Sequence, residues 1–112
     1  MARDRAEAMA ALRAEGLGCT RCDLYRTGFP IVWGEGDVAA PVMLIGQGPG
    51  EQESKAGRPF IGPAGRLLDE ALAATGIARG RLWITNALKH WATTINERGT
   101  VVNRPPKVGE LN

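Results

Sequence analysis

The chain has 112 residues, the size of one domain, and its 14 basic and 12 acidic residues leave a formal net charge of only +2. This balance excludes a protein that coats nucleic acid by charge alone, although it permits a site that engages a few phosphates. The sequence has no apolar run of the length that spans a bilayer, and its first residues lack the apolar core of a secretory signal. We therefore expect a single domain over residues 1–112, in a cytoplasmic monomer with no membrane partner.

The first predicted element is a helix over residues 1–16, which contains an acidic pair at capping-box spacing and ends at Gly16. The turn after it carries Cys19 and Cys22, the only two cysteines of the sequence. In a reducing compartment, cysteines this close together favour metal binding or redox chemistry over a structural disulfide. The residues alone leave open whether the pair is two free thiols, half of a zinc site or part of an iron–sulfur site.

The middle of the chain predicts a strand–helix–strand unit. Residues 42–45 form a continuous apolar run, which indicates a short strand covered on both faces. A helix is expected to begin at Pro63, which suits a first helical turn, and to end at Gly76. A second strand follows at residues 82–87, and this order of elements is typical of parallel strands joined by a right-handed crossover. The sequence therefore predicts an α/β protein.

The last part of the chain is predicted to be less regular. Residues 92–99 are polar and turn-like, and the two prolines within residues 104–106 break any regular element. Residues 106–111 are predicted to form the start of a helix. Because only two strands are evident and sheets usually contain more, we expect the sequence to be the N-terminal part of a longer domain.

A candidate binding site lies at the C-terminal edge of the predicted sheet. In open parallel sheets, ligands bind outside the carboxyl ends of the strands. The glycine- and proline-rich loop that begins at Gly46 leaves the first strand there, Asn86 ends the second strand, and Phe60 lies in the loop between them. A backbone without side chains, an aromatic ring and an amide at one edge suit a small planar ligand.

Each of these residues also has a plainer interpretation. Phe60 by itself is typical of a core aromatic under a loop, and Asn86 of a residue that satisfies a turn. The glycines around Phe60 and the strand-end position of Asn86 favour the binding role over these alternatives. An alternative function of the glycine loop is to bind a nucleotide phosphate. The loop lacks, however, the Lys-Ser/Thr ending of a P-loop and the spacing of the dinucleotide fingerprint.

Five short motifs follow one another along the chain, and their order and spacing together are specific. They are Cys19-x-x-Cys22, Gly46-x-x-Pro49-Gly50-x-x-Glu53, residues 57–65 (GRPFIGPAG), Thr85-Asn86-Ala87 and Asn103-Arg104-Pro105-Pro106. On these motifs the chain resembles the uracil-DNA glycosylase superfamily, most closely its iron–sulfur branch, often called family 4. The resemblance covers nearly all of the chain, from Cys19 to about Leu111. It implies a three-layer α/β/α sandwich with a central parallel sheet, of which this sequence would be the N-terminal part.

The resemblance implies a DNA-repair enzyme that hydrolyses the N-glycosidic bond of deoxyuridine, releases uracil and leaves an abasic site. Its partner would be uracil-containing DNA, from which the nucleotide is flipped into a pocket. Phe60 would stack on the uracil ring, and Asn86 would read its edge with an amide that both donates and accepts. Gly46 would line the same pocket, and the amides of Gln47 and Gly48 would bind a uracil carbonyl and steady the departing anion.

The resemblance also implies a carboxylate that stabilises the oxocarbenium-like sugar or orients a water molecule. Members of this branch usually carry a catalytic glutamate at the position of Gln47, and a glutamine neither acts as a base nor carries negative charge. We therefore treat Gln47, Glu51 and Glu53 as the candidate catalytic residues and expect one of the two glutamates to supply the carboxylate. The alternative is a catalytically weak or inactive module of the same fold that binds DNA or a nucleobase.

Family 4 holds a 4Fe-4S cluster with four ligands, and Cys19 and Cys22 match the first two. The usual place of the third ligand is occupied by His90, and histidine ligates iron in Rieske-type centres. The fourth ligand is expected after Asn112. Zinc is the alternative metal for the same residues.

Overall fold

The computed structural model describes residues 2–27 and 29–111. Met1, the first residue of the predicted N-terminal helix, lies outside these ranges, as do Gly28 and Asn112. Within the described residues, no helix combines the length and the apolar character that a membrane crossing requires.

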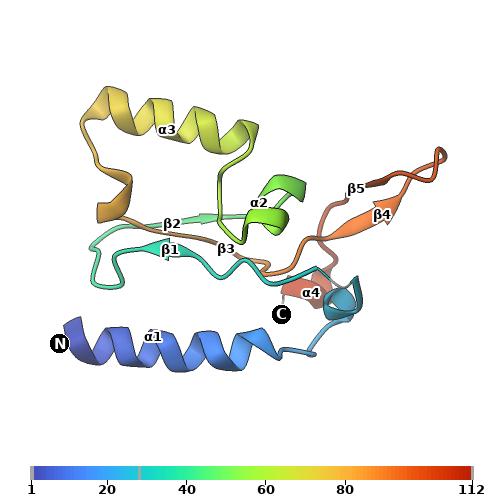
Figure 1. Cartoon of the computed structure of the whole chain (residues 1–112), viewed down its shortest axis with the longest axis horizontal. Coiled ribbons are helices and arrows are strands. Elements are labelled where there is room, and N and C mark those ends of the chain that lie inside the picture. Colours follow the sequence, from blue (N-terminus) through green and yellow to red (C-terminus); the bar gives the residue numbers. More distant parts are fainter. Residues whose placement is uncertain (1, 28, 112) are drawn as a thin grey trace.

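The central strands separate two helices, as Figure 1 shows. Helix α1 (Ala2–Leu17) lies on one side of the strands and helix α3 (Pro63–Thr75) on the other. Gly16, near the end of α1, packs directly onto an indole, because a Cβ at this position would lie 3.0 Å from the ring of Trp33. Helices on both sides of a sheet agree with the predicted α/β class.

Three strands form the sheet, in the order β1-β3-β2. The middle strand β3 (Trp83–Asn86) pairs in parallel with β2 (Met43–Gly46), which confirms the predicted parallel pair. On its other side, β3 pairs antiparallel with the two-residue strand β1 (Glu35–Gly36), which we did not predict. The sheet of the described residues is therefore mixed, with one parallel and one antiparallel pair.

Helix α3 has the ends that the sequence predicts. It begins at Pro63, whose fixed φ and missing N–H suit a first turn, and Gly62 precedes it in an extended conformation. It ends at Gly76, which takes the left-handed conformation with φ of 74° and donates its N–H back to the carbonyl oxygens of the last turn. This helix carries the chain from β2 across to β3.

Shorter helical segments complete the described chain: the 3-10 helices Asp23–Thr27 and Arg79–Arg81, α2 (Glu51–Ala56) and α4 (Val108–Leu111). Helix α4 confirms the predicted helical start near the end of the sequence. Helix α2 was not predicted, because six residues are too few to display a helical period.

The core forms around β3, of which every residue is buried. Its Ile84 is fully enclosed and packs with Leu72 of α3 and with Leu82, and the ring of Phe60 packs against this cluster. A second, smaller cluster joins Leu24, Leu88 and Ala92 below the loop that leaves β3. The buried middle strand thus anchors the two loops that form the candidate site.

The prediction that residues 42–45 are covered on both faces is wrong within the described chain. Ile45 is 64% exposed, and Val42 and Met43 are also exposed, whereas Leu44 packs against the buried cluster. Among the described residues, β2 is an edge strand of the sheet and pairs with β3 alone. An apolar run therefore does not reveal how many faces of a strand are covered.

The prediction of a turn-like segment at residues 92–99 is only partly correct, because residues 93–95 form a strand and the turn itself lies at residues 97–99. Strands β4 (Thr93–Ile95) and β5 (Val101–Asn103) pair antiparallel as a hairpin that extends from the body of the molecule, as Figure 1 shows. The side chain of Asn96 organises the connection by accepting hydrogen bonds from the N–H groups of Arg98 and Thr100. A polar composition is compatible with a solvated hairpin and with a loop, and the pairing of β4 with β5 makes this segment a hairpin.

Candidate functional site

The carboxyl ends of β2 and β3 lie side by side, as the sequence predicts. Gly46 and Asn86 are direct neighbours in the parallel register. Two further hydrogen bonds continue the pairing beyond the strands, from the N–H of Ala87 to the carbonyl of Gly46 (2.8 Å) and from the N–H of Leu88 to the carbonyl of Gln47 (3.0 Å). The start of the glycine loop is therefore fixed to the strand that carries Asn86.

Gly46, Phe60 and Asn86 meet at one point. A Cβ on Gly46 would collide with both Oδ1 of Asn86 and Cζ of Phe60, so only glycine fits between them. Asn86 is 3% exposed, and Phe60 is partly buried. The structure thus brings together an amide, an aromatic ring and a bare backbone that lie far apart in the sequence.

The core interpretation of Phe60 is also partly correct. Its ring packs against the cluster of Leu72, Leu82 and Ile84 in addition to its contact with Gly46. A ring that rests on a rigid core at one side makes a firm platform for a planar group at the other. The two interpretations of Phe60 are therefore compatible.

Arg79 holds the turn that carries Phe60, and we did not identify it from the sequence. Its Nη2 donates to the carbonyl of Pro59 (2.6 Å), and its Nη1 donates both to the carbonyl of Phe60 (3.0 Å) and to Asp69 (2.9 Å). Its Nε lies 3.6 Å from the carboxylate of Glu35. An arginine within a short helix after a glycine turn has no local pattern that reveals such a role.

Glu35 links Arg79 to a second arginine. The side chain of Arg58 donates to its two carboxylate oxygens at 2.8 and 2.9 Å, in the bidentate geometry that favours this pair. These hydrogen bonds lower the pKa of Glu35, and the charge of Arg79 lowers it further, against the opposing effect of burial. The pair joins β1 to the loop before Phe60.

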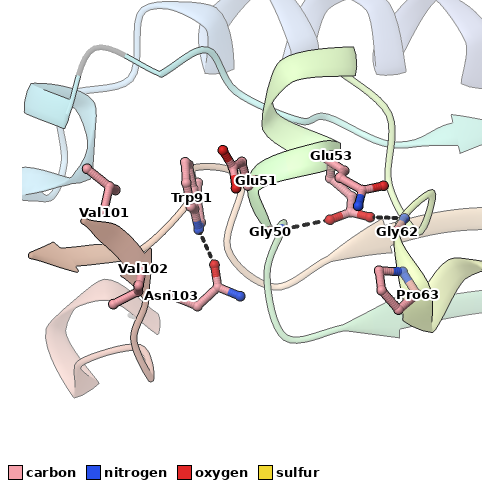
Figure 2. A pocket seen from close by; sticks show the side chains of 10 residues that line it. Gly50, Glu51, Glu53, Gly62, Pro63, Trp91, Val101, Val102 and Asn103 are labelled. Atoms are coloured by element: carbon pink, nitrogen blue, oxygen red, sulfur yellow. Dashed lines mark hydrogen bonds between the residues drawn. The ribbon is translucent and has the colours of Figure 1, made fainter. Parts of the chain in front are cut away.

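Glu53, a candidate catalytic residue, is a structural clamp between the two glycine turns. Its carboxylate accepts hydrogen bonds from the N–H groups of Gly50 (3.0 Å), Ile61 (2.9 Å) and Gly62, and Figure 2 shows it between Gly50 and Gly62. Burial by itself would raise the pKa of Glu53, but these backbone hydrogen bonds outweigh it and the pKa lies below its usual value. The carboxylate is ionised and already engaged.

The other loop candidates face solvent. Gln47 and Gly48 are exposed, and within the described chain their N–H groups donate to no backbone carbonyl. Glu51 is also exposed and pairs with Lys55 at 2.9 Å, one turn further along α2. Two unpaired amides next to Gly46 provide the donors that a carbonyl oxygen or a developing anion requires.

Lys89 supports the backbone of Asn86. Its Nζ donates to the carbonyl of Asn86 (2.6 Å) and to the hydroxyl of Thr85 (2.5 Å), and it lies 5.5 Å from the centre of the Trp33 ring. The hydroxyl of Thr85 in turn donates to the carbonyl of Trp33 (2.7 Å). Burial lowers the pKa of Lys89. These hydrogen bonds hold the backbone of Asn86 in place.

A groove of about 370 Å³ lies beside the glycine turns, between α2 and the β4–β5 hairpin. Figure 2 shows its two walls. On the hairpin side, the indole of Trp91 donates to Oδ1 of Asn103 (2.5 Å) next to Val101 and Val102. On the opposite side, Glu51 and Glu53 line it. Two carboxylates disfavour a phosphate at this place, and the apolar wall suits an uncharged group.

The three predicted metal ligands, Cys19, Cys22 and His90, line one cavity of about 530 Å³. Two thiols and an imidazole fit iron–sulfur or zinc chemistry in kind. Burial lowers the pKa of His90, which favours the neutral imidazole that a metal ligand requires. Among the described residues, however, no three His, Cys, Asp or Glu side chains come close enough together to hold a metal ion.

Glu110 also lines this cavity, but its carboxylate is already committed. Arg104 donates to both of its oxygens, at 2.8 and 2.6 Å. This bidentate pair lowers the pKa of Glu110 to about 2. The same contact removes Arg104 from the side chains available to bind a phosphate.

Comparison with known proteins adds a family to this geometry. Residues 33–112 match the model of the uracil DNA glycosylase superfamily. The matched segment contains Gly46, Phe60, Asn86 and His90, whereas the cysteine pair lies before it.

The chain is also similar to type-4 uracil-DNA glycosylases from several organisms. It is 46% identical to that of Pyrobaculum aerophilum over 71 residues, which are 63% of this chain and 36% of the relative. It is 41% identical to that of Thermotoga maritima over 85 residues, which are 76% of this chain and 44% of the relative. With that of Archaeoglobus fulgidus, the identity is 40% over 83 residues, or 74% of this chain and 42% of the relative. The chain thus spans less than half the length of these curated relatives.

Proposed function

This chain belongs to the uracil-DNA glycosylase superfamily, and from that premise we propose that it carries the base-recognition part of a DNA-repair enzyme. The reaction is hydrolysis of the N-glycosidic bond of deoxyuridine in DNA, which releases uracil and leaves an abasic site. The observation that supports this proposal is the meeting of Phe60 and Asn86 at Gly46. The reacting bond is unreachable within a base stack, so the nucleotide is flipped out of the DNA before it binds.

The site residues divide the work of binding. Phe60 stacks on the uracil ring, and a base–aromatic stack contributes about 1–3 kcal/mol. The Asn86 amide accepts from N3–H of uracil and donates to its O4, because an amide offers both functions. The N–H groups of Gln47 and Gly48 bind a uracil carbonyl and stabilise the negative charge that collects on the base as the bond breaks.

Two glutamates of this loop are candidates for the catalytic carboxylate, and their contacts distinguish them. Glu53 is engaged by three backbone N–H groups, whereas Glu51 is exposed and pairs only with Lys55. Glu51 is therefore the better candidate for orienting water or stabilising the sugar cation. Gln47, at the position of the family's glutamate, contributes its backbone amide rather than a charge.

A second candidate function follows from the state of Glu53 and Gln47. With Glu53 committed to the loop and Gln47 uncharged, the site binds a flipped base more readily than it cleaves the bond. The chain would then belong to a catalytically weak or inactive protein that binds DNA or a nucleobase. Substitution of Gln47 by glutamate distinguishes the two functions, as set out in the Discussion.

We propose a 4Fe-4S cluster as the cofactor, with Cys19, Cys22 and His90 as three of its ligands and zinc as the alternative. Support comes from the chemistry of the two thiols and the imidazole and from their position around one cavity. When bound, such a centre supplies structural order to the loops at this end of the sheet. The recognition of the base remains the task of Phe60 and Asn86.

We further propose that residues 1–112 belong to a single domain with the fold of a three-layer α/β/α sandwich around a central parallel sheet. The positions of α1 and α3 on opposite sides of the strands support this arrangement. The protein is proposed to act as a cytoplasmic monomer on uracil-containing DNA.

A uracil-release assay on single-stranded and double-stranded DNA tests the activity, with the protein in its full-length form. We expect release by the wild type and a loss of about tenfold to a hundredfold in Phe60→Ala, which removes the stack. Leu67→Ala, at a side chain that is 68% exposed on α3, is the matched control. Release by the wild type no faster than by Phe60→Ala contradicts the catalytic proposal.

A further inference from the structure

Phe60 has an unusual backbone conformation. Its φ of 53° makes it the one non-glycine residue in the left-handed region among the residues that the structure describes. For a bulky residue this conformation costs on the order of 1–2 kcal/mol, and it persists only where the surroundings hold it in place. Other contacts must therefore fix the turn at Phe60.

Three features fix this turn, and all of them act on main-chain atoms. Gly65 packs under the carbonyl of Phe60, where a Cβ would collide with it. Glu53 accepts from the N–H groups of Ile61 and Gly62, the two residues that follow. Arg79 donates to the carbonyls of Pro59 and Phe60 themselves. Of the three, only Arg79 bonds both peptide groups that flank the α-carbon of Phe60, the one before it and the one after it.

The contacts of Arg79 require a guanidinium group. Its two terminal nitrogens reach two successive carbonyls, and the first of them also reaches Asp69. Its third nitrogen faces Glu35, and only 18% of the side chain is exposed. The ammonium of a lysine is a single point that cannot span both carbonyls and both carboxylates at once.

We propose that Arg79 is a positioning residue that sets the orientation of the Phe60 ring, and through it the geometry of base stacking. It does so by holding the carbonyls of Pro59 and Phe60 in the left-handed turn, while Glu35 and Asp69 hold Arg79. The ring is thereby kept against Gly46 and Asn86 before any base enters. The placement of the ring is independent of chemistry, whereas its consequence for excision rests on the proposed function.

The placement is tested without substrate in the full-length protein. Nuclear Overhauser contacts between the Phe60 ring and the α-protons of Gly46 report the ring position, and hydrogen exchange of the Ile61 and Gly62 amides reports the turn. We expect Arg79→Met to lose the ring contact and to exchange these amides at least about tenfold faster. Arg81→Met, at an exposed arginine in the same 3-10 helix, is the matched control and keeps both.

A second variant guards against a general loss of fold. Arg79→Lys keeps the positive charge that Glu35 and Asp69 require, but it cannot bond both carbonyls. We expect a weakened ring contact and an intermediate exchange rate in this variant. The comparison uses whichever of Arg79→Met and Arg79→Lys folds. The proposal is overturned if that variant has the same ring contact and the same exchange rates as Arg81→Met.

A double-mutant cycle on uracil excision tests the consequence. We expect Arg79→Lys to lower kcat/KM by about tenfold, and Phe60→Ala to cost about tenfold less in the Arg79→Lys background than in the wild type, because both changes remove the same stack. A residue that only stabilises the fold would give independent, multiplicative losses, and that result overturns the proposal. Absence of excision in the wild type would refute the proposed function, and the ring contact would still decide the role of Arg79.

Discussion

The ring of Phe60 and the side-chain amide of Asn86 lie against the same α-carbon, that of Gly46, although each comes from a different element. Phe60 arrives from the turn before α3, and Asn86 from the end of β3. A side chain on Gly46 would displace both groups. The smallest residue in the site therefore determines the distance between the two groups that we propose to recognise the base.

Gly46→Ala is expected to disrupt base binding without unfolding the protein. The new methyl group collides with both neighbours, and overpacking of this kind costs about 1–3 kcal/mol, or roughly a tenfold to hundredfold loss of kcat/KM. Gly80→Ala is the control, because a Cβ there meets no atom within 4 Å. Equal excision rates in the two variants would show that the three residues do not form one pocket.

Asn86→Asp is expected to abolish the reading of the uracil edge. The carboxylate still accepts from N3–H, but it cannot donate to O4 and it places a negative charge next to the departing anion. A loss of about a hundredfold or more in excision is expected. Asn96→Asp in the hairpin turn is the control, since that side chain acts there as an acceptor and aspartate preserves this function. An active Asn86→Asp variant would contradict the assignment.

Gln47→Glu is expected to raise the rate of excision by about a hundredfold or more, because it restores a carboxylate at the mouth of the pocket. Gln52→Glu adds the same charge within α2 and is the control for electrostatic effects of the loop. A single-turnover assay of uracil release separates chemistry from product dissociation. A gain of that size identifies the natural protein as a catalytically weak form. Fast excision by the wild type, not raised further in Gln47→Glu, would refute the alternative of an inactive binding module.

Glu53→Gln is expected to loosen the two glycine turns at neutral pH. The pKa of Glu53 is lowered in the folded state from its ordinary value of 4.5. Its stabilising effect is therefore fully present above about pH 4.5 and is lost as the pH falls through the lowered pKa. Hydrogen bonds to a charged group contribute about 1.5–3 kcal/mol, so we expect a loss of that order at pH 7.

Urea unfolding of the wild type and Glu53→Gln at several pH values measures this difference. The gap between the two proteins should narrow as the pH falls below about 4.5, where the wild-type carboxylate takes up a proton. Glu51→Gln, which breaks only an exposed ion pair, is the control and should change stability by less than about 1 kcal/mol. A gap that is independent of pH would argue against the clamp.

Cys22→Ser and His90→Ala are expected to lower the bound iron and acid-labile sulfide of anaerobically purified protein. Each change removes one donor from the cavity that also contains Cys19. A broad visible absorbance band in the wild type, absent from both variants, would accompany this loss. Phe60→Ala is the control and should keep its metal. Stoichiometric zinc without iron in the wild type would favour the zinc alternative.

The parts of the fold that could be predicted depend on short-range patterns. Pro63 and Gly76 define the ends of α3, and the apolar runs on either side of it identify β2 and β3. Since ligands bind at the carboxyl ends of parallel strands, this unit was sufficient to bring Gly46 and Asn86 together before the structure was known.

The remainder depends on pairing between distant segments. β1 is two residues long and exists only because it hydrogen-bonds to β3, and the β4–β5 hairpin likewise exists through its own pairing. Arg58 and Glu35 are separated by 23 positions, and no local pattern connects them. The family resemblance made Glu53, together with Glu51, a candidate for the catalytic carboxylate, and the structure gives Glu53 three backbone partners. Its catalytic role stays a prediction.

The three residues that fix the Phe60 turn contact main-chain atoms and not the phenyl ring. Arg79 and Glu53 bind carbonyl and N–H groups, and Gly65 packs under a carbonyl. A change of side chain at position 60 would therefore leave the turn in place. The strength of the stack can accordingly be varied at position 60 alone, while the turn and the amide of Asn86 keep their places.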